Sequence, residues 1–257
     1  MTEDRFTQLV TAERKGKVLT LTLNRAEKSN SLHPDLVRSL SRALREAGSD
    51  PDINVLVLTG AGRSFCAGLD LELLISWTPD EKTAYLETVT EMFRLVWSLD
   101  QPVIGAINGP AIAGGFDLAA FCDIRLASTE AVFGQAEINL GLTQIIHPLY
   151  KTIGLARAKE LALTGQNISA EEAYRIGLVN HIYPPAELMA RVYEMAEVMA
   201  AKPRGALVET KRLTRELIDM ETDAALREIG ETFIRRLNTP EHRERLAEVY
   251  ERLKSRK

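Results

Sequence analysis

Two glycine-containing segments and one later acidic residue have the residue types and spacing for chemistry. The first segment, residues 64–71, reads Ser-Phe-Cys-Ala-Gly-Leu-Asp-Leu, and the second, residues 107–119, reads Ile-Asn-Gly-Pro-Ala-Ile-Ala-Gly-Gly-Phe-Asp-Leu-Ala. Gly114 and Gly115 precede an apolar run, so we expect a helix to begin there. The N–H groups of a first helical turn have no acceptor within the helix and favour an anion, and glycine lets a ligand approach closely. The pattern indicates backbone donors that stabilise a developing negative charge.

Two carboxylates accompany these donors. Asp117 lies almost one helical turn after Gly114, so it shares a helix face with that N–H group. Glu137 follows 20 residues later in the run Phe-Gly-Gln-Ala-Glu. Carboxylates held beside a reacting carbon can move protons when their pKa is tuned toward the working pH. The alternative roles are charge stabilisation of the helix N-terminus by Asp117 and an ordinary surface loop position for Glu137.

Taken together, these segments resemble the crotonase superfamily, also called the enoyl-CoA hydratase/isomerase family, and the resemblance extends over nearly the whole chain. It implies that the N–H groups of Leu69 and Gly114 bind the thioester oxygen of an acyl-CoA. It also implies that Glu137 is the main acid–base residue and that Asp117 is its partner. The function expected from the resemblance is that of an enoyl-CoA hydratase, a carbon–oxygen lyase.

The sequence departs from the family pattern at two places. The position of Asp117 is typically Glu in the hydratases, so the carboxylate here is one methylene shorter and either sits closer to the water or only positions it. After Glu137, many members have a Pro and several Gly, whereas residues 140–151 are shorter and lack those glycines. We expect this loop to shape the acyl pocket. His147 lies within it, and a structural role is favoured over contact with the substrate.

Several other functions remain compatible with the same oxyanion site. One is double-bond isomerisation, and others are hydrolysis of the thioester or hydration of a cyclic dienoyl-CoA. A non-catalytic CoA-ester binding protein is a further alternative. The Asp117/Glu137 pair favours hydration. A nicotinamide enzyme is rejected, because the third glycine after the strand at 55–58 would fall on Phe65.

Residues for the CoA moiety follow from the resemblance alone. The family binds this end of its substrate largely through backbone groups of two segments, which correspond here to residues 24–32 and 67–70. Residues Phe233 and Arg252 of the C-terminal helices are expected to complete the CoA site of a neighbouring subunit, with packing or a solvated charge as the alternatives. The expected substrate- and CoA-binding residues of the two N-terminal segments are Lys28, Ser29, Ala67, Gly68 and Asp70.

The elements that position these residues alternate between strands and helices, which predicts an α/β fold. Short apolar or alternating runs predict strands at 18–23, 55–58, 103–107 and 124–127, and residues 71–99 read as one largely helical stretch. The resemblance implies a crotonase-like spiral core of repeated ββα units over residues 1–195. It also implies a C-terminal helical trimerisation region over 196–257, which forms a homotrimer or a homohexamer built as a dimer of trimers.

Composition excludes several classes of function. The 257 residues are 45% apolar and 26% charged. The net charge of −4 does not indicate binding to nucleic acid or to an anionic membrane, because both attract proteins with an excess of positive charge. No apolar run is long enough to cross a bilayer, and the N-terminus is too polar for a secretory signal. Cys66 and Cys122 do not form a C-x-x-C pair, and the four histidines lack metal-ligand spacing. We expect a cytoplasmic protein without metal or redox cofactor, with coenzyme A present only as part of the substrate.

Overall fold

The computed structural model describes residues 9–255. The chain divides into two compact units, residues Met1–Glu197 and Val198–Lys257, and each unit is described by itself. Among the described residues, no helix is both long enough and apolar enough to cross a membrane.

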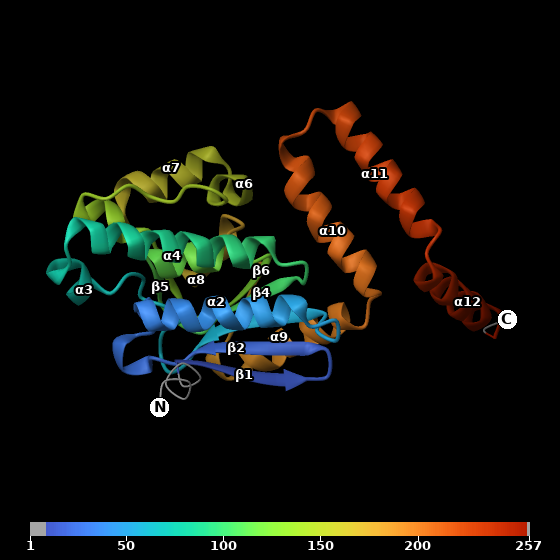
Figure 1. The fold of residues 1–257 in the computed structure, drawn as a ribbon, viewed down its shortest axis with the longest axis horizontal. Coiled ribbons are helices and arrows are strands. Elements are labelled where there is room, and N and C mark those ends of the chain that lie inside the picture. Colours follow the sequence, from blue (N-terminus) through green and yellow to red (C-terminus); the bar gives the residue numbers. More distant parts are fainter. Residues whose placement is uncertain (1–8, 256–257) are drawn as a thin grey trace. The chain divides into compact units, whose positions relative to one another are not determined.

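A six-stranded sheet forms the centre of the first unit (Figure 1). Strand β1 runs antiparallel to β2, and the other neighbouring pairs are parallel, in the order β1-β2-β3-β4-β6-β9. Strands β3 and β4 are buried along their whole length, which accounts for their continuous apolar sequence. The strands are β1 (Val10–Lys15), β2 (Val18–Leu23), β3 (Val55–Gly60), β4 (Val103–Ile107), β6 (Ile124–Ser128) and β9 (His181–Tyr183).

A second, three-stranded sheet contains β5 (Ala111–Ile112), β7 (Val132–Gly134) and β8 (Ile168–Ser169). Strand β5 pairs parallel with β7, and β7 pairs antiparallel with β8. The chain thus alternates between two sheets and returns through helices, as expected for a crotonase-like spiral. The predicted α/β fold class is confirmed.

Helices cover both faces of the large sheet. Helices α2 and α4 lie side by side on one face (Figure 1), and their apolar residues share a core with Leu56 and Leu58 of β3. On the other face, the hydroxyl of Thr20 in β2 lies 3.0 Å from the hydroxyl of Tyr193 in α9. The helices and 3-10 turns of this part are η1 (Ala26–Lys28), α2 (Pro34–Ser49), α3 (Leu71–Ser76), α4 (Pro79–Ser98), α5 (Gly114–Ala120), η2 (Ala136–Leu140), α6 (Leu149–Ile153), α7 (Leu155–Thr164), α8 (Ala170–Arg175) and α9 (Pro185–Ala200).

The largely helical stretch predicted over 71–99 is confirmed, and the structure divides it into α3 and α4. Thr78 caps α4 in a capping box: its side chain accepts from the Glu81 N–H, and the Glu81 carboxylate accepts from the Thr78 N–H. Pro79 follows as the first helical residue, where its missing N–H is harmless, and it disfavours helical geometry at the residue before it. The apolar periodicity of residues 71–99 alone did not indicate this boundary between α3 and α4.

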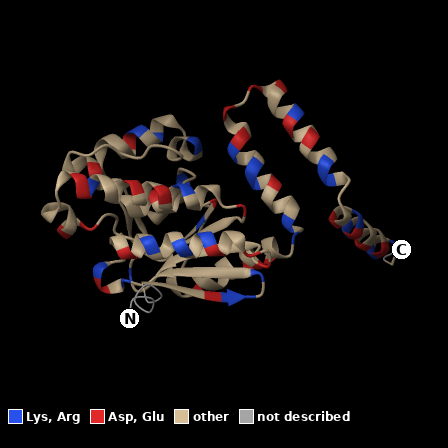
Figure 2. Ribbon diagram, viewed as in Figure 1, with Lys and Arg blue, Asp and Glu red and all other residues tan. Residues whose placement is uncertain are grey.

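The second unit contains α10 (Arg204–Glu216), η3 (Leu217–Asp219), α11 (Thr222–Leu237) and α12 (Pro240–Lys254). Charges of both signs alternate along these helices (Figure 2). Arg212 of α10 pairs with Glu228 of α11 at 2.8 Å and donates to the Thr232 hydroxyl at 2.9 Å, which links the two helices. The apolar side chains that remain exposed on α11 and α12 include Leu226, Phe233, Ile234, Leu246, Tyr250 and Leu253.

A buried guanidinium fixes the far end of α5. Arg125, 5% exposed, donates to the carbonyls of Cys122 and Leu178 at 2.5 Å and to that of Ala119 at 3.3 Å. These carbonyls belong to the end of α5 and to the segment before β9. Arg125 therefore satisfies backbone oxygens that water cannot reach, and it holds α5 in place.

Replacing Arg125 by Met leaves these buried carbonyls without a donor, so we expect the free energy of unfolding to fall by about 2–4 kcal/mol. The matched control is Arg94→Met, which removes an exposed pair with Glu91 and is expected to change stability by less than about 1 kcal/mol. Urea unfolding of both variants measures the difference. Equal, small effects would contradict the proposed anchoring of α5.

Candidate functional site

Two backbone segments approach each other closely at the start of α5. The segment at Cys66 pairs with β5: a parallel bridge joins Cys66 to Ala111, and the Ile112 N–H donates to the Cys66 carbonyl at 3.0 Å. A Cβ on Gly115 would lie 2.0 Å from that carbonyl oxygen, and a Cβ on Gly68 would lie 2.9 Å from the Gly114 nitrogen. Glycine is required at both positions because the backbones leave no room for a side chain.

The structure brings Leu69 and Gly114 together, as the resemblance implied. Gly114 is the first residue of α5, so its N–H has no acceptor within the helix. Leu69 forms a parallel bridge with Leu32, whose N–H donates to the Gly68 carbonyl at 2.7 Å. Leu32 thus donates to the residue before Leu69 and not to Leu69 itself, and in a parallel bridge of this kind the Leu69 N–H points away from Leu32. Both residues line one cavity.

Ala113, just before α5, has an unusual backbone conformation, with φ 52° and ψ −129°. Side chains rarely tolerate such geometry, and it costs about 1–3 kcal/mol. Two backbone hydrogen bonds stabilise this conformation. The Ala113 N–H donates to the Gly134 carbonyl at 2.7 Å, and the Ala113 carbonyl accepts from the Asp117 backbone N–H at 3.1 Å. This strained residue turns the chain from β5 into α5 and orients the Gly114 N–H.

The two predicted carboxylates lie in the same cavity, which has a volume of about 180 Å³. Asp117 comes from α5 and is 2% exposed, and Glu137 comes from η2 and is 8% exposed. Burial raises the pKa of Asp117 well above its ordinary value, and the nearby charge of Glu137 raises it further. Burial also raises the pKa of Glu137, whose Oε2 atom has no hydrogen-bond partner among the described residues. Such a pair is suited to holding a proton and a water.

Gln135 is a functional residue that the sequence reasoning missed. It is fully buried, and its Nε2 atom donates both to Asp117 Oδ1 at 3.2 Å and to the Ile145 carbonyl at 3.0 Å. The backbone carbonyl of Gln135 accepts from Gln144 Nε2 at 2.9 Å. This amide therefore links Asp117 to the loop after Glu137. A polar residue two positions before Glu137 at the end of a buried strand was the available signal.

The remaining walls of the cavity come from α4 and from the loop that departs from the family pattern. Leu142, Thr143 and Ile145 of the loop line it, and so do residues of one face of α4, which are Leu86, Val89, Thr90 and Phe93. His147 is not among the lining residues; its ring lies edge-on to Trp97 and Tyr150, with centroids 5.9 Å away in each case. This placement agrees with the structural role favoured for His147.

The expected CoA-binding residues of the N-terminal segments lie together. The Ala67 N–H donates to the Ser29 carbonyl at 3.0 Å, and Lys28 forms an ion pair with Glu72 at 2.8 Å. Asp70 is 6% exposed, and Arg25 binds it at 2.6 Å. Burial opposes the charge of Asp70, but the hydrogen bond and charge of Arg25 together with the Glu72 N–H outweigh it, so the pKa of Asp70 is lowered. The Asp70 carboxylate thus fastens the loop of Gly68 and Leu69 to the segment at Arg25.

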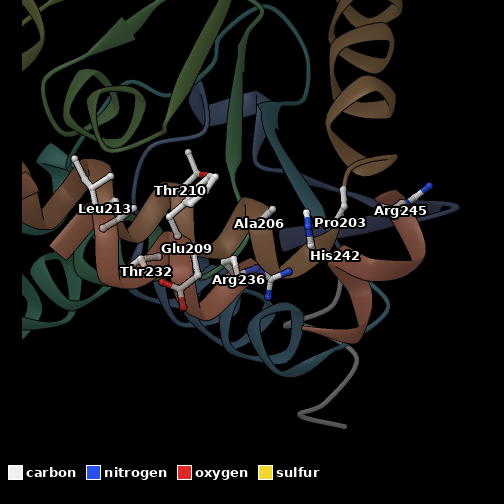
Figure 3. Close-up of a pocket in the computed structure, with 11 residues that line it drawn as sticks. Pro203, Ala206, Glu209, Thr210, Leu213, Thr232, Arg236, His242 and Arg245 are labelled. Carbon is white, nitrogen blue, oxygen red and sulfur yellow. The ribbon is translucent and has the colours of Figure 1, made fainter. Parts of the chain in front are cut away.

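The two expected C-terminal residues occupy separate places within the second unit. Phe233 lines a cavity of about 340 Å³ between α10, α11 and the start of α12, together with Arg236, His242 and others (Figure 3). Arg252 is exposed and lines a different hollow with Lys202 and Val249. Their part in the CoA site of a neighbouring subunit stays a prediction. Among the described residues, no group of His, Cys, Asp or Glu is arranged to hold a metal ion.

The model of the enoyl-CoA hydratase/isomerase family matches residues 13–256. The chain belongs to this family. It is 34% identical over 249 residues to the short-chain-enoyl-CoA hydratase of Clostridium acetobutylicum, and the matched residues cover 95% of this chain and 95% of that one. It is also similar to the crystal structure of an enoyl-CoA hydratase from Bacillus anthracis, with a TM-score of 0.93 and 31% identity over 95% of this chain and 97% of that one. A monofunctional enoyl CoA isomerase from M. smegmatis matches with a TM-score of 0.73 and 33% identity over 86% of this chain and 99% of that one.

The glycine at 68 offers a test of the backbone contact. Gly68→Ala places a Cβ 2.8 Å from the Ile112 carbonyl and 2.9 Å from the Gly114 nitrogen, so we expect turnover of crotonyl-CoA to fall by about 10²-fold or more. Gly177→Ala is the matched control: Gly177 also has a positive φ, but nothing lies within 4 Å of its Cβ position. The control is expected to lose about 1 kcal/mol of stability and to keep its activity. Equal activity losses in both variants would contradict the assigned donor geometry.

The buried carboxylate makes stability depend on pH. Because the pKa of Asp117 is higher in the folded protein than its ordinary value of 3.8, the folded state binds the proton more tightly. Its contribution to stability therefore falls as pH rises from about 4 through the folded-state pKa. We expect Asp117→Asn to raise the free energy of unfolding at pH 7 by more than about 1 kcal/mol and to lose this advantage below pH 4. Urea unfolding of the wild type and the variant at pH 7 and below pH 4 measures this difference in stability. A difference that is the same at both pH values would contradict the raised pKa of Asp117.

Proposed function

We propose that this chain hydrates the double bond of an enoyl-CoA thioester. The observation that supports the proposal most strongly is the cavity that contains Leu69, Gly114, Asp117 and Glu137 together. Two backbone donors and a buried carboxylate pair are the groups that water addition to a conjugated thioester requires. The names of the similar proteins support the same activity.

The reaction follows from this arrangement. The thioester oxygen accepts hydrogen bonds from the N–H groups of Leu69 and Gly114, which stabilise the negative charge that develops there. Two buried carboxylates that share one cavity, where burial and the charge of Glu137 raise the pKa of Asp117, hold one proton between them, and we assign it to the more deeply buried Asp117. Asp117 then orients the water, and the ionised Glu137 removes a proton from it.

The bonds change in two stages. As Glu137 takes the proton, the water oxygen bonds to the β-carbon, and the π electrons of the double bond move onto the thioester oxygen as an enolate. The enolate then collapses, and its α-carbon takes the proton from Glu137. Both hydrogens and the oxygen of one water are in the product, and Glu137 returns to its ionised form. The Gln135 amide holds Asp117 Oδ1 throughout, which leaves Oδ2 for the water.

Isomerisation is the second candidate, because the similarity to a monofunctional isomerase supports it and Asp117 replaces the usual Glu. In that reaction Glu137 alone would move a proton between two carbons. Hydration is preferred because both carboxylates lie in the cavity and Asp117 is held in place by Gln135. Thioester hydrolysis and binding without catalysis remain further outcomes of the test below.

The proposed substrate and assembly extend this function. The CoA end of the substrate is placed at Lys28, Ser29, Ala67 and Gly68, beside the thioester site, and no other cofactor takes part. A homotrimer, or a hexamer formed from two trimers, is proposed to assemble through α10 to α12, and the exposed apolar residues on α11 and α12 support this. A cytoplasmic location is proposed as well.

The activity is tested with crotonyl-CoA in H₂¹⁸O and mass spectrometry of the product. A product heavier by one labelled water is expected, and Glu137→Gln is expected to reduce its formation by at least about 10²-fold. Glu130→Gln, at an exposed position outside the cavity, is the matched control and should retain activity. A shifted double bond from a 3-enoyl-CoA without label would identify an isomerase, and free CoA would identify a hydrolase. A near-native rate of Glu137→Gln would remove Glu137 from the mechanism.

A further inference from the structure

Helix α5 runs along the cavity from the donor end toward an aromatic cluster. Gly114 begins the helix, Asp117 follows after almost one turn, and Phe121 is the C-cap residue. The spacing of these residues, i, i+3 and i+7, places them on one face of the helix. With a rise of 1.5 Å per residue, Phe121 lies roughly 10 Å beyond Gly114 along the axis.

Phe93 of α4 lies at the Phe121 end of this path. It lines the cavity although it is only 3% exposed, and its ring stacks on that of Phe121 at a centroid distance of 5.3 Å and an interplanar angle of 9°. Behind this pair, Trp97 contacts Phe121 edge-on at 6.2 Å. Phe93 therefore lies between the cavity and the rings of Phe121 and Trp97, which pack behind it.

The opposite boundary of the cavity is open to solvent. Leu86 of α4 is 44% exposed, and Leu142 of the loop is 45% exposed. Thr90 and Thr143, the polar residues of the walls, are exposed as well. Apart from the donors and the carboxylate pair, the buried lining is apolar, with Val89 and Phe93 as members, each 3% exposed. A charged or strongly polar acyl end would find no partner there.

We infer that Phe93, braced by Phe121, closes the inner end of the acyl cavity and restricts this enzyme to short aliphatic enoyl-CoA substrates. The inference rests on the proposed function. With the thioester at Gly114 and the β-carbon beside Asp117, about one helical turn remains before the Phe93 ring. A crotonyl group fits this space, whereas a long chain must either displace the ring or leave through the gap between Leu86 and Leu142.

The experiment compares kcat/KM for crotonyl-, 2-hexenoyl- and 2-decenoyl-CoA in the wild type and in Phe93→Leu and Phe93→Ala. The wild type is expected to prefer crotonyl-CoA over 2-decenoyl-CoA. Phe93→Ala is expected to shift that ratio toward the long chain by about 10-fold or more, and Phe93→Leu by less, because each methylene in an apolar pocket changes selectivity by about 10- to 200-fold. Phe93→Leu tests the inference if the alanine variant does not fold.

Two controls separate specificity from general damage. Phe116→Leu alters another buried aromatic of α5 that packs on Phe133 and does not line the cavity, so it should lower thermal stability without changing the ratio. Leu163→Ala alters an exposed leucine of α7 that does not line the cavity, so it should leave the chain-length preference unchanged. Equal kcat/KM values of the wild type for all three substrates, or an unchanged ratio in active Phe93 variants, would overturn the inference.

Failure of the proposed function gives a different result. If the wild type transforms none of the three substrates, the proposed hydration fails, and binding then tests the size limit by itself. Calorimetric titration with butyryl-CoA and decanoyl-CoA measures it without turnover. Tighter binding of butyryl-CoA, with the difference reduced in Phe93→Ala, would support the closed end, and equal affinities would overturn it.

Discussion

The contact between two stretches of backbone, residues 66–69 and 113–115, determines the rest of the site. Because Gly115 lies against the Cys66 carbonyl, α5 begins at one position only, and its first N–H faces the same cavity as Leu69. Three interactions in the surrounding structure stabilise this contact. Arg125 holds the far end of α5, the ion pair of Arg25 with Asp70 fastens the loop, and hydrogen bonds to Gly134 and Asp117 stabilise the strained Ala113.

The same rigidity explains the state of the carboxylates. Asp117 cannot turn toward water because it belongs to a helix that is buried along its whole length, and its one described side-chain partner is an amide. An ionised carboxylate is disfavoured at this position. Burying Asp117 therefore lowers the stability of the folded protein near neutral pH, but it keeps a proton within reach of the substrate. Glu137 comes from a 3-10 turn and is slightly more exposed, which suits the group that must gain and lose a proton.

Local sequence patterns predicted much of this arrangement. The start of α5 follows from two glycines before an apolar run, and β2, β3, β4 and β6 of the large sheet follow from short apolar or alternating segments. The edge strands β1 and β9 lack such a pattern and were not predicted. The break between α3 and α4 depends on Thr78 and Pro79, whose capping chemistry was overlooked. The role of Gln135 and the cavity face of α4 were not predictable in this way. Both depend on which elements meet in space, and an amphipathic helix pattern does not say what its apolar face contacts.

The shared amide of Gln135 has a consequence for how such an enzyme can diverge. One NH₂ group binds both the carboxylate of Asp117 and the carbonyl of Ile145, and Ile145 also forms part of the cavity wall. Insertions or deletions in this loop would move that carbonyl and so disturb the acid–base group at the same time. Selectivity for a new acyl group and proton transfer are thus not independent traits in this lineage. A change in loop length must therefore be accompanied by a change at Gln135 or Asp117, so fewer combinations of substitutions keep the enzyme active.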